Sequence, residues 1–226
     1  MASAFKEPDL VSGGRGAARC PLGRLYFLTM DEGPIDHLQQ VDAACGAGIK
    51  WIQLRMKQAS DEEVRATALA AKKITDANGS VLIINDRVEV ALEVKASGVH
   101  LGRQDMAVSA ARRLLGEDRI IGGTANTIED IREHYAQGAD YIGLGPYRYT
   151  TTKKNLSPIL GLEGYRRIMR MLKQEQVSIP LIAIGGIEMK DAAPLFGVGL
   201  HGIAFSGMLV HAEDRMAMVK SINKLF

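Results

Sequence analysis

Two closely spaced apolar runs in the middle of the chain are each followed by an acidic side chain. The run 81–84 ends at Asn85 and Asp86, and the run 98–101 is followed by Asp105. The short segment between the runs has a helical composition, so the spacing predicts a strand–helix–strand unit with parallel strands. Both carboxylates are then expected at the same C-terminal edge of a sheet. A hard divalent cation with a phosphorylated ligand would need such a pair.

Each acidic residue also has a simpler interpretation. Asp86 could cap a helix that begins near Arg87, and taken alone this capping role is favoured. Asp105 could sit in a turn. Considered together, beside Arg55 and Lys57 of the preceding strand, the two acids favour a metal–diphosphate site. Mg²⁺ typically uses one or two carboxylates together with phosphate and water oxygens.

Cationic and amide side chains alternate along another apolar run. Gln53, Arg55 and Lys57 are separated by two residues each, so in a strand they point to the same side. A guanidinium and an ammonium at the mouth of a barrel suit phosphate oxygens. A solvated strand end is the alternative. The phosphate interpretation is favoured because Leu54 and Met56 take the opposite face.

Glycines follow the last two apolar runs of the chain. Gly186 ends one of these runs, and Ser206 with Gly207 ends the other. Glycine lets a backbone N–H approach a phosphate closely, and barrels often bind phosphate on their last two loops. The alternative is that these glycines simply turn the chain. Phosphate binding is the favoured interpretation.

A polar loop precedes these glycines. It carries three hydroxyls and two ammoniums in a row, at Thr150, Thr151, Thr152, Lys153 and Lys154. The run suits a mobile anion clamp, although a polar surface loop would have the same composition. His100 is interpreted as structural rather than as a ligand. The pattern contains no His/Cys cluster for zinc and no Ser-His-Asp arrangement.

Eight strand-like runs position these residues. They cover 25–29, 51–55, 81–85, 98–101, 120–124, 141–145, 181–185 and 202–206. Each is followed by a polar turn and a segment of helical period, which predicts parallel strands. Ser60 with Glu63 forms a capping-box pattern, and Thr127 precedes another helical segment. Near-even spacing favours a closed (β/α)₈ TIM barrel over a doubly wound open sheet.

Composition limits the class of protein. The chain has 226 residues, of which 46% are hydrophobic and 24% charged, with a formal net charge of +2. This balance argues against a nucleic-acid partner, and no apolar run reaches the length of a membrane span. Two cysteines favour a reducing, cytoplasmic setting. Residues 1–23 are expected to be a flexible lead before a single barrel domain at 24–226. A homo-oligomer is left open.

In this order the strand ends resemble those of the thiamine phosphate synthase family. The matching stretches are WIQLRMK, LIINDRVEVAL with GVHLGRQD, IIGGTANT, DYIGLGPYRYTTTKK, and PLIAIGGI with HGIAFSG. The resemblance covers nearly everything after the lead. It implies a transferase that joins a hydroxymethylpyrimidine diphosphate to a thiazole phosphate and releases pyrophosphate, with Mg²⁺. It also implies a dissociative reaction, in which the bond to diphosphate breaks before the thiazole nitrogen attacks.

The resemblance implies roles for individual residues as well. The diphosphate would be held by Gln53, Arg55, Lys57 and Asn85, with Lys153 nearby, and Mg²⁺ would be bound by Asp86 and Asp105. Thr124 would lie by the reacting centre. The thiazole phosphate would be contacted by Thr150 and Thr152 and by backbone N–H groups of Gly186, Ser206 and Gly207. Among these, Arg55, Thr124 and Lys153 would be catalytic. The chain departs from the family pattern at Met56, Arg103, Thr124 and Gly207, and none of these changes removes a charge that the reaction needs.

Two other functions fit the same barrel. A thiazole tautomerase-like isomerase needs a proton-transfer group near the thiazole, and no histidine is suitably placed on the fifth strand. A non-catalytic sensor of phosphorylated ligands would need neither Asp86 nor Asp105. The presence of both acids favours the synthase.

Overall fold

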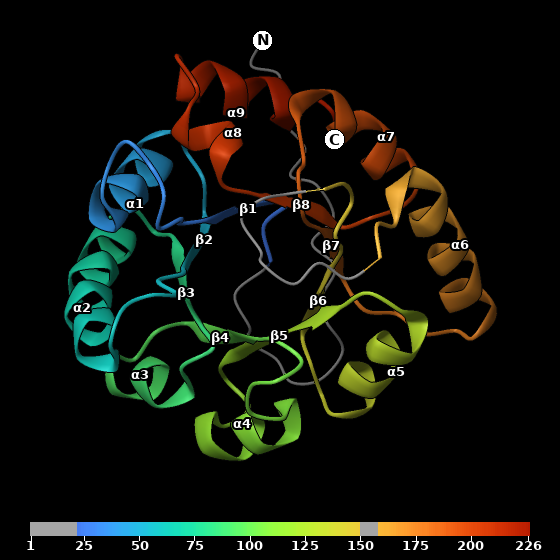
Figure 1. Ribbon diagram of the computed structural model, residues 1–226, viewed down its shortest axis with the longest axis horizontal. Helices are drawn as coiled ribbons and strands as arrows, with labels where there is room; N and C mark the ends of the chain where they lie inside the picture. Colours follow the sequence, from blue (N-terminus) through green and yellow to red (C-terminus); the bar gives the residue numbers. More distant parts are fainter. Residues whose placement is uncertain (1–21, 150–157) are drawn as a thin grey trace, which may run out of the picture.

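Eight parallel strands close into a barrel at the centre of the molecule (Figure 1). The computed structural model describes residues 22–149 and 158–226. The strands are β1 (Leu25–Leu28), β2 (Trp51–Leu54), β3 (Val81–Asn85), β4 (Gly98–Leu101), β5 (Ile120–Ala125), β6 (Tyr141–Leu144), β7 (Leu181–Ala183) and β8 (Gly202–Phe205). Each strand pairs with the next in the chain, and β8 pairs with β1. The predicted closed (β/α)₈ barrel is confirmed. Most of the predicted lead lies outside the described residues.

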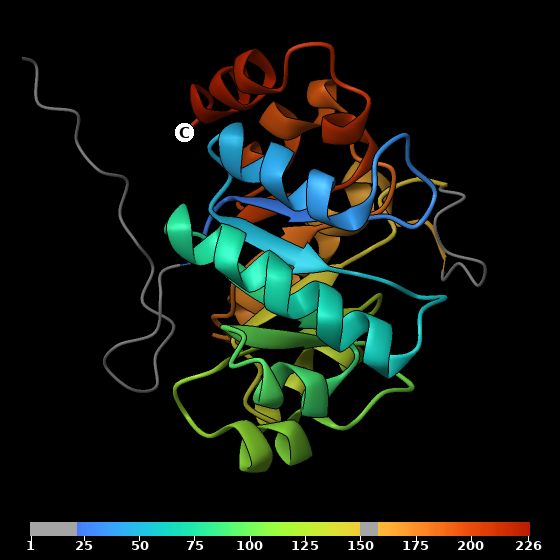
Figure 2. The same ribbon diagram turned by 90° about the vertical axis from the view of Figure 1, so that its left-hand side faces the viewer.

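Helices form a ring around these strands (Figure 1). They are α1 (His37–Gly46), α2 (Asp61–Ala77), α3 (Val88–Glu93), α4 (Val108–Leu115), α5 (Ile128–Ala136), α6 (Gly161–Gln174), the short 3₁₀ helix η1 (Met189–Asp191), α7 (Ala192–Gly197), α8 (Gly207–Val210) and α9 (Arg215–Asn223). The capping box of Ser60 and Glu63 opens α2, as predicted. Thr127 caps α5 by accepting a hydrogen bond from the backbone N–H of Asp130. Figure 2 shows α1 and α2 lying along the outside of the barrel.

Alternation along the strands divides the apolar side chains into two layers. Phe27, Ile52 and Ile84 point outward and pack beneath the helices in the larger core. Tyr26 and Ile83, one residue away from such outward positions, point into the barrel. Since a strand has a period of two residues, the polar residues that share the inward parity are delivered to the barrel interior.

Aromatic rings fill the barrel interior near the beginnings of the strands. Tyr26 and Trp51 stack with their ring centroids 3.9 Å apart, and Tyr141 meets Trp51 edge-on at 4.6 Å. A Cβ atom at Gly122 would overlap the ring of Tyr141, so glycine is what allows this ring to cross the interior. The packed rings form a floor, and the space above them faces the C-terminal ends of the strands.

The described helices and the one described cysteine bear on the membrane and redox expectations. Within residues 22–149 and 158–226, no helix combines the length and apolarity needed to cross a membrane. Cys45 is a free, buried thiol, whereas Cys20 lies outside the described residues. Burial raises the pKa of the Cys45 thiol, which makes it a packing residue rather than a nucleophile.

Candidate active site

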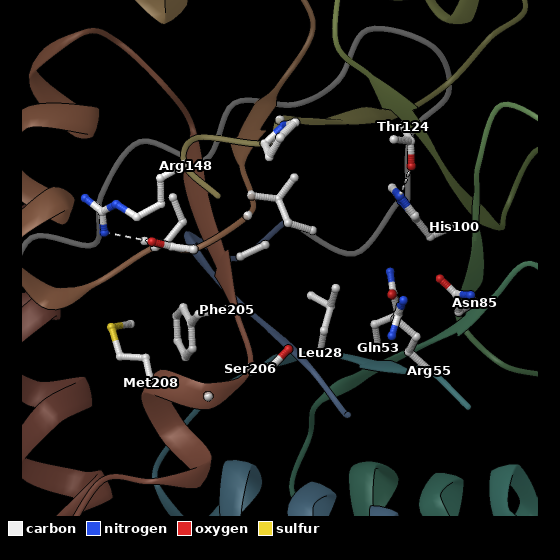
Figure 3. A pocket seen from close by; sticks show the side chains of 18 of the residues that line it. Leu28, Gln53, Arg55, Asn85, His100, Thr124, Arg148, Phe205, Ser206 and Met208 are labelled. Carbon is white, nitrogen blue, oxygen red and sulfur yellow. Dashed lines mark hydrogen bonds between the residues drawn. The ribbon is translucent and has the colours of Figure 1, made fainter. Parts of the chain in front are cut away.

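A cavity of about 380 Å³ lies at the C-terminal ends of the strands (Figure 3). Most of the residues predicted to act in one site line it: Gln53, Arg55, Lys57, Asn85, Asp86, Thr124, Gly186, Ser206 and Gly207. They come from strands that are far apart in the chain, and closure of the barrel brings them together. Thr150, Thr152 and Lys153 lie outside the described residues, so their roles stay predictions.

Lys57 and Asp86 line one wall of the cavity, and Asp105, which is not among the lining residues, contacts Asp86. The Lys57 ammonium donates to the Asp86 carboxylate, and the Asp86 and Asp105 carboxyls hydrogen-bond to each other. Asp105 also accepts a hydrogen bond of 2.6 Å from the backbone N–H of Gly102. The alternative in which Asp86 caps a helix is wrong, because α3 begins after Arg87 and has no side-chain cap.

The backbone explains where Asp86 points. Its φ of 64° lies in the left-handed region, which is uncommon for residues other than glycine. Its N–H donates to the carbonyl of His100 on the neighbouring strand, at 2.8 Å. This turn directs the carboxylate across the top of β4 towards Asp105 instead of along α3. A strained residue at a cluster of charged groups is typical of a functional site.

Proximity shifts the pKa values of the two carboxyls in opposite directions. Burial by itself would raise the pKa of Asp86, but hydrogen bonds from Asp105 and Lys57 outweigh it and lower the pKa. Burial, and then the hydrogen bond with Asp86, raise the pKa of Asp105. Two adjacent carboxylates repel each other when both are ionised, and a divalent cation bound between them would relieve this repulsion.

The donor set fits Mg²⁺ bound together with a phosphorylated ligand. Across the described residues, no group of three or more His, Cys, Asp or Glu side chains is arranged to hold a metal. Asp86 and Asp105 are two oxygen ligands, which leaves most of the octahedral shell of Mg²⁺ to phosphate and water oxygens. A closed structural metal centre would need more protein ligands.

Two buried amide atoms beside the acidic pair lack partners. Within the described part of the chain, Gln53 Oε1 and Asn85 Nδ2 have no hydrogen-bond partner. Gln53 is 1% exposed and Asn85 is 5% exposed, so bulk water does not reach these two atoms to form hydrogen bonds with them. Buried polar groups are rarely left unpaired, and both residues line the cavity. A ligand that offers an acceptor to Asn85 and a donor to Gln53 would complete both.

Arg55 is braced by the loop that follows β1. Its backbone N–H donates to Thr29 Oγ1 at 2.9 Å, and this hydroxyl also contacts His37 Nδ1 at 2.8 Å. Asp31 contacts His37 Nε2 at 3.2 Å and accepts from the backbone N–H of Lys57, also at 3.2 Å. Burial lowers the pKa of Arg55, and the carboxylates of Asp31 and Asp86 offset part of this effect. An arginine guanidinium stays charged in such a setting.

His100 is a residue of the cavity wall whose position the sequence did not reveal. Its Nε2 lies 2.9 Å from Thr124 Oγ1, and its Nδ1 lies 3.1 Å from the hydroxyl of Tyr141 (Figure 3). The Tyr141 hydroxyl is 2.8 Å from that of Tyr26, which accepts from Gln53 Nε2 at 2.7 Å. A buried hydrogen-bonded chain therefore crosses the barrel from Thr124 to Gln53. His100 pairs with Asn85 of β3 and points into the barrel as Asn85 does. Its place in the strand alternation of β4 could therefore have indicated this position from the sequence.

The other end of the cavity is formed by the loops after β6, β7 and β8. Gly185 and Gly186 have φ values of 94° and 68°, which only glycine adopts readily. A Cβ atom at Gly186 would overlap the side chain of Arg148. Packing against Arg148 therefore explains why residue 186 is a glycine. The reason predicted from the sequence was different, namely the close approach of its backbone N–H to a phosphate. Sequence reasoning also overlooked Arg148, because its partners follow only after β7.

Comparisons with known proteins identify the family of the chain. Residues 25–209 match the model of a family described as thiamine monophosphate synthase. Thiamine-phosphate synthases of Bacteroides fragilis and Bacteroides thetaiotaomicron are each 48% identical over 198 residues, covering 88% of this chain and 97% and 95% of those proteins. The solved structure of a thiamine phosphate pyrophosphorylase from Pyrococcus furiosus is 32% identical with a TM-score of 0.77, covering 89% of this chain and 94% of that one.

Proposed function

Because the chain belongs to the thiamine monophosphate synthase family, we propose that it is the transferase that couples a hydroxymethylpyrimidine diphosphate to a thiazole phosphate. The products are thiamine phosphate and pyrophosphate. The observation that carries this proposal is the joined carboxyl pair of Asp86 and Asp105 beside Lys57, at one end of a cavity with a second, glycine-lined end.

The acidic end of the cavity would take the diphosphate. Arg55 and Lys57 supply positive charge, and the unpaired Asn85 Nδ2 would donate to a phosphate oxygen. Asp86 and Asp105 would hold Mg²⁺, which when bound neutralises charge on the diphosphate as it leaves. In the absence of a cation, the two acids would repel the diphosphate.

Gln53 has a different task in this proposal from the diphosphate contact that the resemblance implied. Its Nε2 is committed to Tyr26, so the atom it presents to the cavity is the unpaired acceptor Oε1. An acceptor does not suit a phosphate oxygen. It suits the amino group of an aminopyrimidine, and would orient the ring with its diphosphate towards Arg55.

The glycine-lined end would take the thiazole phosphate. Gly186, Ser206 and Gly207 line this end and offer backbone N–H groups. Leu28 lies between the two ends of the cavity (Figure 3), and Ile184 also lines it. These apolar side chains suit the two substrate rings. Thr124, held by His100, would lie where the two substrates meet.

The reaction that this arrangement supports requires no general base. The carbon–oxygen bond between the pyrimidine methylene and the diphosphate breaks, and its electron pair leaves with pyrophosphate. The amino group on the pyrimidine stabilises the resulting cation. The thiazole nitrogen then donates its lone pair to form the carbon–nitrogen bond. The protein's own contribution is positive charge from Arg55 and Lys57 and alignment of the two rings.

Coupling by the purified chain tests the proposal. The chain is incubated with both substrates, with Mg²⁺ and with a chelator, and thiamine phosphate and pyrophosphate are measured together. Equal amounts of the two products, formed only with Mg²⁺, are expected. Release of pyrophosphate without thiamine phosphate, or rearrangement of the thiazole alone, would refute the synthase assignment and favour a hydrolase or an isomerase.

A further inference from the structure

Arg148, just after β6, connects the loops that form the glycine-lined end of the cavity. Its two terminal nitrogens each lie 2.7 Å from a carboxylate oxygen of Asp191. The same guanidinium donates to the carbonyl of Gly186 at 2.7 Å and lies 3.1 Å from Glu188. Its stem packs over Gly186, and the guanidinium lies 4.9 Å from the ring centroid of Tyr147. One side chain therefore ties the loop after β6 to the loop after β7.

The contacts of Arg148 assign it to structure rather than to substrate charge. The Asp191 carboxylate is 5% exposed and forms a bidentate pair with the guanidinium. Hydrogen bonding to Asp191 raises the pKa of Arg148, so the guanidinium stays charged. Glu188 adds a second negative charge, which is shared with Lys190 at 2.7 Å. The four charges sum to zero, and the guanidinium is already committed to protein acceptors.

Arg148 controls the orientation of two peptide planes. Its backbone N–H donates to the carbonyl of Gly185 at 3.1 Å, and its guanidinium donates to the carbonyl of Gly186. In a trans peptide, the carbonyl and the following N–H point in opposite directions. Both carbonyls face Arg148, so the N–H groups of Gly186 and Ile187 face away from it. Glycine is required at Gly186 because any Cβ would displace the arginine stem.

We propose that Arg148 is a positioning residue for the thiazole phosphate: it presents the N–H groups of Gly186 and Ile187 to that phosphate without touching it. The identity of the ligand rests on the proposed function. The physical reason is that an N–H pair on two glycine-linked peptides would otherwise rotate freely, and fixing it beforehand removes the cost of ordering it on binding. Arg148 thus acts through the backbone of another loop.

Matched variants separate positioning from direct binding. Arg148→Met keeps the stem over Gly186 and removes the fork, while Arg148→Lys keeps a charge without the planar geometry. Arg132→Met is the control, because Arg132 forms a comparable two-point pair with Glu175 between α5 and the end of α6. Asp191→Asn weakens the same fork from the other side and still offers an oxygen to the backbone N–H of Glu188.

Steady-state kinetics with both substrates give the main result. Arg148→Met should raise the KM for thiazole phosphate about 10- to 100-fold, leaving the KM for the pyrimidine diphosphate and the Tm close to wild type. Asp191→Asn should act in the same direction, and the double variant should add little. Arg148→Lys should recover only part of the loss, and Arg132→Met should match wild type. An equal rise of both KM values, an unchanged KM, or full recovery with lysine would overturn the proposal.

A second readout works without catalysis. Amide hydrogen exchange at Ile187 in the free protein should be about tenfold faster in Arg148→Met than in Arg132→Met, because the guanidinium no longer holds the Gly186 carbonyl. Exchange at Gly186 should change less, because the preceding carbonyl keeps its bond from the backbone N–H of residue 148. Thiazole phosphate titrated by calorimetry should bind correspondingly more weakly. If wild type binds this ligand but forms no product, the proposed reaction fails while the positioning role stands. Unchanged exchange in Arg148→Met refutes the positioning role whatever the activity.

Discussion

Removing the divalent cation should affect the two ends of the cavity very differently. Asp86 and Asp105 contact each other at the end of the cavity that we propose for the diphosphate, where both carboxylates would repel an anion. The end proposed for the thiazole phosphate depends on backbone N–H groups, and among the described residues there the charges of Arg148, Asp191, Glu188 and Lys190 sum to zero. Chelation should therefore weaken pyrophosphate binding strongly and thiazole phosphate binding little.

The contacts set the size of the effect. Lys57 is paired with Asp86, and Arg55 attracts the diphosphate, so Asp105 is the carboxylate that would oppose it. Two unit charges about 4 Å apart interact by about 4 kcal/mol at an effective dielectric constant of about 20. The Lys57 side chain is 40% exposed, so solvent screening reduces this value. We expect a loss of about 10- to 100-fold in pyrophosphate affinity, equivalent to about 1.4–2.8 kcal/mol.

Calorimetric titration of pyrophosphate and of thiazole phosphate, with Mg²⁺ and then with a chelator, measures both affinities. Asp105→Asn provides a test of sign. With Mg²⁺ the variant should bind pyrophosphate more weakly than wild type, because a metal ligand is impaired. With chelator it should bind pyrophosphate more tightly, because a repelling charge is gone. If both ligands lose affinity equally on chelation, or Asp105→Asn shifts in the same direction in both conditions, the division into two anion sites is wrong.

Three further outcomes are expected. Arg55→Ala should lower kcat/KM about 10- to 100-fold with little change in Tm, and Arg55→Lys should restore only part; a large fall in Tm without a kinetic defect would show a structural role instead. Gly122→Ala should destabilise the fold by about 1–3 kcal/mol in urea unfolding, because its Cβ overlaps the Tyr141 ring. The control Gly46→Ala, on a helix with no atom nearby, should be neutral or stabilising by up to about 1 kcal/mol, and equal losses would contradict the packing argument. Burial lowers the pKa of His201 from 6.5, so the unfolded chain binds more protons below that pH and stability falls as the pH drops. Urea unfolding of His201→Gln at about pH 7.5 and about pH 5.5 should show a smaller fall, and an unchanged fall would assign the effect elsewhere.

Local pattern was sufficient to predict the barrel and much of its mouth. A strand has a period of two residues whatever it packs against, so parity alone placed Gln53 on the same side as Arg55 and Lys57. Asn85 and Thr124 were placed by their positions at the ends of strands and by the family resemblance. Helix starts are equally local, because a cap bonds within its own first turn. The capping box of Ser60 and Glu63 was found for this reason. Parallel strands then bring their C-terminal ends to one side.

Partners that meet across strands were decided only by the tertiary structure. The register between β4 and β5 pairs His100 with Gly122 and lets the His100 side chain reach Thr124 further along β5. Nothing near either residue in the chain specifies that contact. Arg148 and Asp191 are separated along the chain by α6 and β7, yet form one bidentate pair. Periodicity is a property of the backbone of one segment, whereas a hydrogen-bond partner depends on how neighbouring strands align and on barrel closure. The ring of polar residues was therefore readable from the sequence, and its internal bonding was not.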